Sequence, residues 1–387
     1  MEYRLEELFD LQMGKTPSRS VTEYWESGNN KWISIADLSK CGKYIYDTKE
    51  CLSDIAVSES GIKQIPANTV VMSFKLSIGK TAITSEPMYS NEAIMSFRDR
   101  KLVQLLPEYI YYLLLSKNWD DGTNKAVMGK TLNKATLSKV KVNIHSMQEQ
   151  QELVYVLNQA TALIELHQQQ LQKLDDLVKA RFVEMFGMPG TDTKGWGLQY
   201  LGTCCELNPK KGTDKRLVSG LSVSFVPMPA VSESGKIDAS QIKAYDEVKT
   251  GFTYFAENDV LFAKITPCME NGKGAVAVGL CNNIGFGSTE FHILRPINNK
   301  SNPYWLYSLT SFDAFRKDAA DNMTGSAGQR RVPAVFLEKY KVTLPPIELQ
   351  NQFAAFVKQT DKSKVAVQKS LDEAQLLFDS LMQQYFG

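Results

Sequence analysis

The sequence predicts an α+β protein of two α/β domains separated by two long helices, which form an antiparallel coiled coil within a pseudo-twofold internal repeat. A long helical pattern that ends in Phe-Gly occurs twice, at residues 146–187 and 346–387. A globular stretch with short β-type runs precedes each copy, which indicates a duplicated unit of globule and helix. Identical residues recur 200 positions apart: Leu137/Leu337, Lys141/Lys341, Val142/Val342, Gln150/Gln350, Leu171/Leu371 and Leu177/Leu377.

The first predicted domain covers residues 1–145. Short apolar or alternating runs between turns are typical of strands, whereas Pro107 opens a run with helical spacing. The predicted strands are Lys31–Ile35, Thr69–Phe74, Lys80–Thr84 and Ala93–Phe97, and the predicted helix is Pro107–Leu115.

The first long helix is predicted over residues 146–187. Alternate steps of four and three residues from Leu153 give a mostly apolar heptad seam, which is the pattern of a coiled coil. Ser146 and Glu149 have the spacing of a capping box, and Gly187 suits the helix end. The seam residues expected to contact the partner helix are Leu157, Ile164, His167, Leu171, Leu174 and Val178.

The second domain, residues 188–345, repeats the pattern of the first. Its predicted strands are Asp259–Ala263, Ala275–Val278 and Phe291–Leu294, and its predicted helix is Pro303–Ser311. Asn68–Lys75 resembles Asn258–Lys264, and Gly79-Lys80 before a strand resembles Gly272-Lys273. The second long helix, residues 346–387, is expected to contact its partner through Val357, Lys364, Leu371 and Phe378.

The antiparallel arrangement follows from connectivity, because each long helix leads away from its own globule. A helix of roughly 38 residues spans about 57 Å at about 1.5 Å per residue, so the pair could act as a ruler. The alternative is two independent amphipathic helices, each packed on its own domain.

Composition excludes several classes of protein. No stretch approaches a membrane span, and the acidic N-terminal segment lacks the features of a secretory signal, so a cytoplasmic location is expected. The six cysteines show no Cys-x-x-Cys spacing and there are only three histidines, which predicts reduced thiols and no metal site. The net charge of +1 divides into +2 for residues 1–147, −3 for 148–187, +3 for 188–347 and −1 for 348–387. This division suits globules that contact phosphates and helices that contact protein.

Catalytic motifs are absent from the sequence. Three Gly-Lys-Thr tripeptides lack the leading glycine of a Walker loop, since Phe9, Phe74 and Asn124 occupy its position. Asn208-Pro209 continues with Lys210 and so lacks the rest of an adenine methyltransferase motif. The sequence therefore predicts a binding protein without a catalytic residue.

Basic clusters at matched places in the two halves indicate nucleic acid as the ligand. Residues 122–147 carry five lysines and, in the second half, a Gly/Ser loop ends in two arginines. Backbone N–H groups of such a loop can hold phosphates, and Gln or Arg can contact base edges in the major groove. Solvated basic faces are the alternative for each cluster. The expected contacts are Lys130, Lys134, Lys210, Lys211, Lys215, Ser326, Gln329, Arg330 and Arg331.

The chain resembles the specificity subunits of Type I restriction-modification enzymes. The resemblance lies in Gly14–Arg19 with Tyr24-Trp25 and Trp32–Ser34, in the segment around Lys80, in the loop around Arg330 and in both long helices. It covers the whole chain, although Leu207–Lys210 departs from the Gly-x-Thr-Pro pattern. It adds Lys15, Thr16, Ser18, Arg19, Lys75, Lys80, Lys264 and Lys273 to the expected DNA contacts.

This resemblance implies a non-catalytic subunit whose two target-recognition domains read a bipartite, asymmetric site in double-stranded DNA. It also implies docking of two methyltransferase subunits on the helices and of restriction/translocase subunits in the full complex. S-adenosylmethionine, Mg²⁺ and ATP would then belong to those partners, and none would bind this chain. A coiled-coil adaptor with two protein-binding globules is the alternative.

Overall fold

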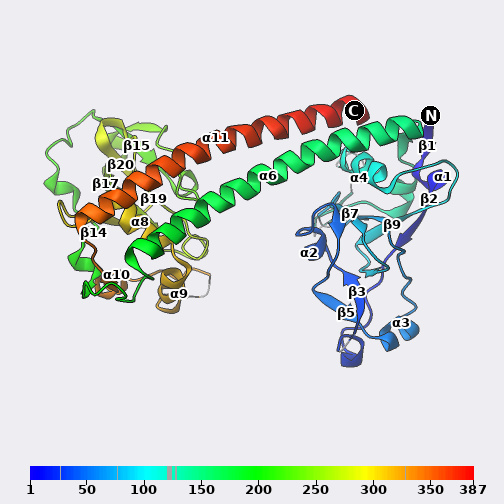
Figure 1. Cartoon of the computed structure of the whole chain (residues 1–387), viewed down its shortest axis with the longest axis horizontal. Coiled ribbons are helices and arrows are strands. Elements are labelled where there is room, and N and C mark those ends of the chain that lie inside the picture. The colour runs from blue at the N-terminus through cyan, green and yellow to red at the C-terminus, as the bar shows by residue number, and fades with distance from the viewer. Residues whose placement is uncertain (27, 76, 120–123, 127–128, 327) are drawn as a thin grey trace. The chain divides into compact units, whose positions relative to one another are not determined.

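The computed structural model describes residues 1–26, 28–75, 77–119, 124–126, 129–326 and 328–387, with the backbone alone at 124–126, 129–131 and 213. The chain forms two compact units, shown in Figure 1. Unit 1 contains Met1–His167 and Ser370–Gly387, and unit 2 contains Gln168–Lys369. Each unit therefore holds one α/β domain and a part of both long helices.

The domain of unit 1 is built on a five-stranded sheet in the order β2-β9-β6-β7-β4. Its strands are antiparallel except for the parallel pair β4 and β7. Their bounds are β2 Phe9–Met13, β4 Tyr44–Ile45, β6 Val70–Ser73, β7 Thr81–Thr84 and β9 Ile94–Asp99. A three-stranded sheet contains β5 (Glu50–Leu52), β3 (Asn30–Ile33) and β8 (Tyr89–Ser90), and the hairpin β10 (Asn124–Ala126) and β11 (Gly129–Thr131) follows.

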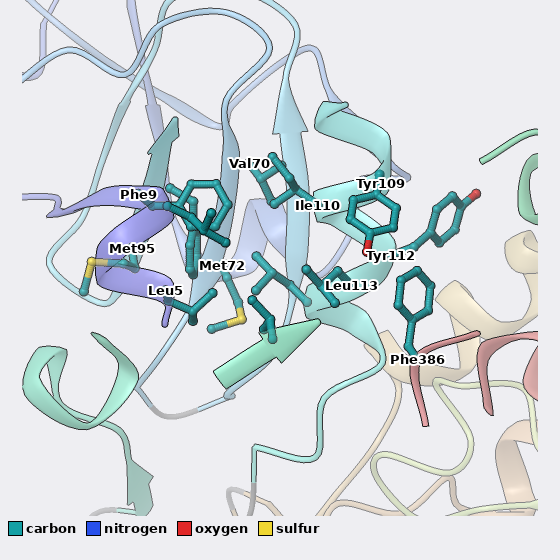
Figure 2. Packing of buried hydrophobic residues seen from close by; sticks show 14 of the residues in the cluster. Leu5, Phe9, Val70, Met72, Met95, Tyr109, Ile110, Tyr112, Leu113 and Phe386 are labelled. Carbon is teal, nitrogen blue, oxygen red and sulfur yellow. The ribbon is translucent and has the colours of Figure 1, made fainter. Parts of the chain in front are cut away.

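The helices of this domain are short, apart from the two that cross the unit. They are α1 (Leu5–Leu8), α2 (Ile35–Leu38), α3 (Asp54–Ser60), α4 (Pro107–Leu115) and α5 (Lys134–Ser138). The core lies between the main sheet and α4, where Val70 and Met72 of β6 pack with Ile110 and Leu113 (Figure 2). The predicted helix Pro107–Leu115 and the four predicted strands are confirmed, with strand ends shifted by a residue or two.

Unit 2 repeats this plan with a different second sheet. Its main sheet has the order β14-β21-β18-β19, and its second sheet has the order β16-β15-β20-β17. The strands are β14 Cys205–Leu207, β15 Ser222–Val226, β16 Ile242–Ala244, β17 Thr253–Ala256, β18 Val260–Ala263, β19 Gly274–Val276, β20 Ile284–Gly287 and β21 Phe291–Pro296. The helices are α7 Tyr245–Val248, α8 Pro303–Ser311, α9 Asp313–Asp321 and α10 Ala334–Lys339. The predictions for β18, β19, β21 and α8 are confirmed within two residues.

A two-stranded ladder closes each domain beside its long helix. β1 (Glu2–Arg4) pairs with β12 (Lys141–Asn143), and β13 (Leu198–Tyr200) pairs with β22 (Lys341–Thr343), both antiparallel. Each ladder brings the first and last segments of a domain together directly before the following helix begins. These strands of three residues are too short for a periodic pattern, and the sequence did not predict them.

Equivalent hydrogen bonds define which positions of the two domains correspond. The N–H of Leu132 donates to Phe74 O at 3.0 Å in unit 1, and the N–H of Val332 donates to Lys264 O at 2.9 Å in unit 2. Lys264 is therefore the counterpart of Phe74, and the parallel drawn from the sequence between Lys75 and Lys264 was wrong by one residue. Asn68 and Asn258, which precede β6 and β18, both have positive φ angles (57° and 69°).

The long helices α6 (Met147–Phe186) and α11 (Ile347–Phe386) have the predicted caps and seam. The Ser146 N–H donates to Glu149 Oε2 at 2.8 Å, which confirms the capping box, and Gly187 ends α6 with a φ of 84°. Seam positions are buried or half-buried, whereas Glu165 and Gln169 on the other side of α6 are exposed.

Within each unit the two helical segments run in opposite directions. In unit 1 the end of α11 meets the start of α6, because the ring of Phe386 meets that of His145 edge-on at a centroid distance of 6.2 Å. The Phe386 ring also lies 5.6 Å from that of Tyr109 in α4 (Figure 2). In unit 2 the start of α11 meets the end of α6, because Phe353 lies 5.5 Å from Phe182 and 5.3 Å from Phe186. Together these contacts confirm the predicted α+β repeat with an antiparallel helix pair.

Candidate nucleic-acid interface

A hairpin closed by Thr324 and Arg331 carries the arginines that the sequence singled out in unit 2. Thr324 and Arg331 close it through two backbone hydrogen bonds of 3.0 and 2.8 Å. The N–H of Thr266 donates to Arg330 O at 3.0 Å, which ties the hairpin to the chain leaving β18. Gly325 has a φ of 119°, a conformation that side-chain-bearing residues rarely adopt.

Arg331 forms a bidentate ion pair with Glu290 at the base of this hairpin. Its Nε and Nη2 donate to the two carboxylate oxygens at 2.9 and 2.8 Å, and its Nη1 donates to Gln329 O at 3.1 Å. The Arg331 guanidinium holds the pKa of Glu290 below its usual value, so the pair is ionised at neutral pH. Lys264 adds to this effect through its nearby charge.

The other predicted groups of the hairpin are less constrained. Arg330 makes one contact with an acid, from Nη2 to Glu270 Oε1 at 3.2 Å, and its side chain is 43% exposed. Ser326 and Gln329 are exposed at the tip. The hairpin therefore carries the guanidinium of Arg331, which is held by several hydrogen bonds, and that of Arg330, which is held by one, together with the polar residues Ser326 and Gln329.

Unit 1 has a hairpin at the same place. Asn124 pairs with Thr131 in β10 and β11, which is the register of Thr324 and Arg331 shifted by 200 residues. Lys130 lies in β11, but its side chain is outside the part of the chain that the structure describes. Lys134 is exposed at the start of α5.

The loop after β2 holds four predicted contacts, and most of them are engaged within the protein. Lys15 Nζ donates to Ser60 O at the end of α3, and Thr16 Oγ1 donates to Glu92. Arg19 forms a bidentate pair with Glu50 at 2.6 and 2.9 Å, and its guanidinium stacks 3.6 Å from the Trp25 ring centroid. Ser18 is exposed and shares a hydrogen bond with the Ser20 hydroxyl.

Lys211 occupies in unit 2 the place of Lys15. Its Nζ donates to Lys249 O, which follows α7 as Ser60 ends α3. Both lysines thus bring a positive charge to a helix C-terminus, where it is favourable. The departure of Leu207–Lys210 from the Gly-x-Thr-Pro pattern does not abolish this correspondence. Lys210 and Lys215 are exposed in the same segment.

Asp214 holds the basic segment around Lys210–Arg216 in place through hydrogen bonds. It accepts from Nε and Nη2 of Arg216 at 2.9 and 2.7 Å and from the Tyr254 hydroxyl at 2.7 Å. The hydrogen bonds from Arg216 lower the pKa of Asp214 well below its usual value. The basic segment is thereby held against β17 of the second sheet, apart from the hairpin that joins β18 of the main sheet.

The remaining predicted lysines flank the strand ends of the main sheets. Lys75, Lys80, Lys264 and Lys273 are half-buried. Lys75 Nζ lies 5.2 Å from the Phe74 ring centroid, and Lys264 lies beside Glu290. The structure thus brings Lys264, Arg331 and Glu290 together.

The seam residues lie on the less exposed sides of α6 and α11. Lys364 Nζ contacts Asp175 of α6 at 2.6 Å and Asp361 of its own helix at 3.5 Å. Leu157 and Val357 are buried, and the seam residues that are half-buried are Ile164, His167, Leu171, Leu174, Val178, Leu371 and Phe378.

The sequence did not predict the carboxylates that pair with the candidate arginines. Glu50, Asp214 and Glu290 each hold one arginine, and two of these three pairs join residues more than 30 positions apart. Only Asp214 lay close enough in sequence to Arg216 for an Asp-x-Arg pair to be suspected. Among the described residues no helix could cross a membrane, and no cluster of three or more His, Cys, Asp or Glu side chains could hold a metal ion.

Comparisons with known proteins identify relatives of this chain. The type I restriction modification DNA specificity domain matches residues 1–176 and 220–374. The EcoAI specificity subunit of Escherichia coli is 37% identical over 195 residues, which cover 49% of this chain and 32% of that protein. The MjaIX specificity subunit of Methanocaldococcus jannaschii is 22% identical, with coverage of 98% and 90%. The chain thus spans about a third of the EcoAI subunit but most of the MjaIX subunit.

Solved structures share the fold at low sequence identity. The S subunit of a type I restriction-modification system from M. genitalium superposes with a TM-score of 0.54 at 13% identity, covering 100% of this chain and 96% of that chain. A second chain, from work on complex assembly and conformational transition of the type I R-M system, also gives a TM-score of 0.54, at 15% identity and with coverage of 99% and 96%. With two matched segments that span most of its length, the chain belongs to the type I restriction modification DNA specificity domain family.

Proposed function

We propose that this chain is the specificity subunit of a Type I restriction-modification complex and that it recognises a bipartite, asymmetric site in double-stranded DNA. The observation that carries the proposal is the pair of hairpins at 124–131 and 324–331, which share a register but not a sequence. One scaffold that presents different side chains at the same place can read two different half-sites.

The chain acts in this proposal without catalysis and without a cofactor of its own. The candidate arginines Arg19, Arg330 and Arg331 are paired with carboxylates, an arrangement suited to directional hydrogen bonding with bases. Methyl transfer and restriction would belong to partner subunits, with S-adenosylmethionine, Mg²⁺ and ATP as their ligands. The cytoplasm, where the host DNA lies, is the proposed location.

The long helices supply the proposed docking surface for two methyltransferase subunits and, in the full complex, for restriction/translocase subunits. Tyr155, Leu163 and Leu166 of α6 are 66%, 45% and 48% exposed. They fall on one side of the helix, away from the seam residues Leu157 and Ile164, because positions 3 and 11 residues apart face similar directions. Exposed apolar residues on one helix face are typical of a protein contact.

The test is to purify the chain with its methyltransferase partner, to let the complex methylate a library of DNA of varied sequence, and to map N6-methyladenine in the product. One bipartite sequence should be methylated, and binding to DNA should weaken steeply between low and moderate salt because phosphate contacts release counterions. Methylation without sequence preference would contradict the proposal. A chain that binds other proteins but no DNA would favour the alternative of a coiled-coil adaptor.

A further inference from the structure

Glu290 balances the positive charge of Arg331 but uses only some of the hydrogen-bond donors of its guanidinium. Glu290 takes up the edge formed by Nε and Nη2, and Gln329 O takes one hydrogen of Nη1. Glu290 and Gln329 O thus use three of the five guanidinium hydrogens, and the two that remain for a further bidentate contact lie one on Nη1 and one on Nη2. The ion pair reduces the net charge of the group while leaving this pair of donors in place.

We infer that Arg331, oriented by Glu290, reads a guanine in the half-site contacted by unit 2, and that Glu290 is a positioning residue for specificity. This inference rests on the proposed function. The O6 and N7 atoms of guanine accept two hydrogen bonds from one guanidinium edge in the major groove. A guanidinium that is paired with a carboxylate gains little binding free energy from a phosphate, because its positive charge is already compensated. Its remaining donors can still form directional hydrogen bonds with such a base edge.

Several features show that the arrangement is built into the fold. The backbone of Arg331 is fixed by its bonds to Thr324, and Glu290 is fixed because its carbonyl accepts from the Lys264 N–H at 2.9 Å. The Glu290 N–H also donates to Ser288 Oγ at 3.2 Å. Both partners are therefore anchored before DNA arrives, which reduces the entropy lost when a base is bound.

A second arginine of unit 2 has the same arrangement. Arg216 gives its Nε and Nη2 to Asp214, and its Nη1 points to Asn282 O at 3.5 Å. The side chains of Arg216 and Arg331 are 50% and 42% exposed, so neither is enclosed by the protein.

Unit 1 lacks this pair at the equivalent positions. The N–H of Phe74 donates to Ala93 O at 2.9 Å as that of Lys264 donates to Glu290 O, so Ala93 stands where unit 2 has Glu290. Thr131 stands where unit 2 has Arg331. The contact proposed for Arg331 therefore has no counterpart at this place in unit 1, and the half-site read by unit 1 serves as an internal control.

The experiment uses the chain purified with its methyltransferase partner and a duplex carrying the selected site, with each base pair of the second half-site changed in turn. Arg331→Ala and Arg331→Lys should each lower discrimination at one G·C pair, by roughly 10- to 100-fold. Lysine keeps the charge but lacks the two-donor edge, so it should not rescue discrimination. Recognition of the first half-site should stay unchanged in both variants.

Glu290→Gln should relax discrimination at the same base pair while raising affinity for non-specific DNA. The released guanidinium charge can then contact a phosphate, so the slope of log K against log salt should steepen by about 0.9. Glu270→Gln is the matched control, since it removes the same charge beside the hairpin from the partner of Arg330 and not of Arg331; it should leave discrimination at the base pair read by Arg331 intact.

Two results would overturn the inference. Arg331 variants that keep full discrimination but flatten the salt dependence would make Arg331 a phosphate contact. A Glu290→Gln variant that weakens specific and non-specific binding equally would make Glu290 merely structural. A wild-type complex that selects no sequence at all would instead contradict the proposed function.

Discussion

Gln150 and Gln350, the fourth residues of α6 and α11, make the same three hydrogen bonds in the two units. Gln150 Oε1 accepts from the Leu106 N–H at 3.1 Å, and its Nε2 donates to Gln104 O and His145 O, both at 3.0 Å. Gln350 Oε1 accepts from the Asn302 N–H at 2.8 Å, and its Nε2 donates to Lys300 O and Pro345 O at 3.1 and 2.8 Å. Each side chain is buried and locks the loop before α4 or α8 onto the start of a long helix.

Replacing Gln350 by Leu should lower the free energy of unfolding by about 2–4 kcal/mol, because one N–H and two carbonyls would lose their partner in a buried place. Urea unfolding of the full chain measures the loss. Gln352→Leu is the control, since Gln352 is exposed two residues along the same helix and its substitution should change stability by less than about 0.5 kcal/mol. Equal losses in the two variants would show that the three bonds do not matter.

Asp214→Asn should destabilise unit 2 in a pH-dependent manner. Arg216 and Tyr254 lower the pKa of Asp214 in the folded protein, so its carboxylate stabilises the fold at every pH above the unfolded pKa of about 3.9. This contribution is lost as pH falls from that value through the folded pKa. The difference in unfolding free energy between wild type and variant should thus be constant from about pH 8 to pH 5 and shrink below about pH 4.

Urea titrations at a series of pH values check this prediction. Asp246→Asn is a useful comparison, because Asp246 is also a carboxylate with a lowered pKa but it bonds to Gly220 and Ser219 instead of an arginine fork. A difference between wild type and Asp214→Asn that grew as the solution was acidified would have the wrong sign.

The sequence was informative where a pattern is long or local. The heptad seams run over ten positions each, and the capping box of Ser146 and Glu149 is complete within four residues, so both could be read directly. Helices α4 and α8 begin with a proline and bury a continuous apolar face, which fixes their bounds. Interactions of this kind depend on neighbours in the chain.

The contacts that could not be predicted join residues that lie far apart in the sequence. Glu290 and Arg331 lie 41 residues apart, and neither residue type nor spacing shows that they meet. Lys211 was expected to contact phosphate because it lies in a basic cluster, and Lys15 because of the resemblance. The sequence did not show that each also donates to a carbonyl at the end of a short helix later in the chain. A one-residue difference before the hairpins made Lys75 seem equivalent to Lys264, and only the backbone hydrogen bonds identify Phe74 as the counterpart.

Reversing the charge of Lys364 should test the register of the helix pair in unit 2. Lys364→Glu would place a third acid beside Asp175 and Asp361 and should lower the unfolding free energy by about 1 kcal/mol. Adding Asp175→Lys should recover part of that loss, because the pair between the helices is restored in the opposite sense. Thermal unfolding measures both; a double variant no more stable than Lys364→Glu alone would show that the two side chains do not interact.

Inserting one heptad in each long helix should lengthen the unread spacer of the DNA site without changing either half-site. The insertions belong after His167 and after Lys369, so that residues paired within each unit keep their partners. Seven residues add about 10 Å of helix, which corresponds to about three base pairs at about 3.4 Å each. Mapping of N6-methyladenine in DNA modified by the variant complex measures the spacer directly. A two-residue insertion is the control, since it turns the following part of the seam by about 200°, away from the partner helix, and should reduce stability instead of giving a new spacer. If the heptad variant still methylates the original site, the helices do not set the distance between the half-sites.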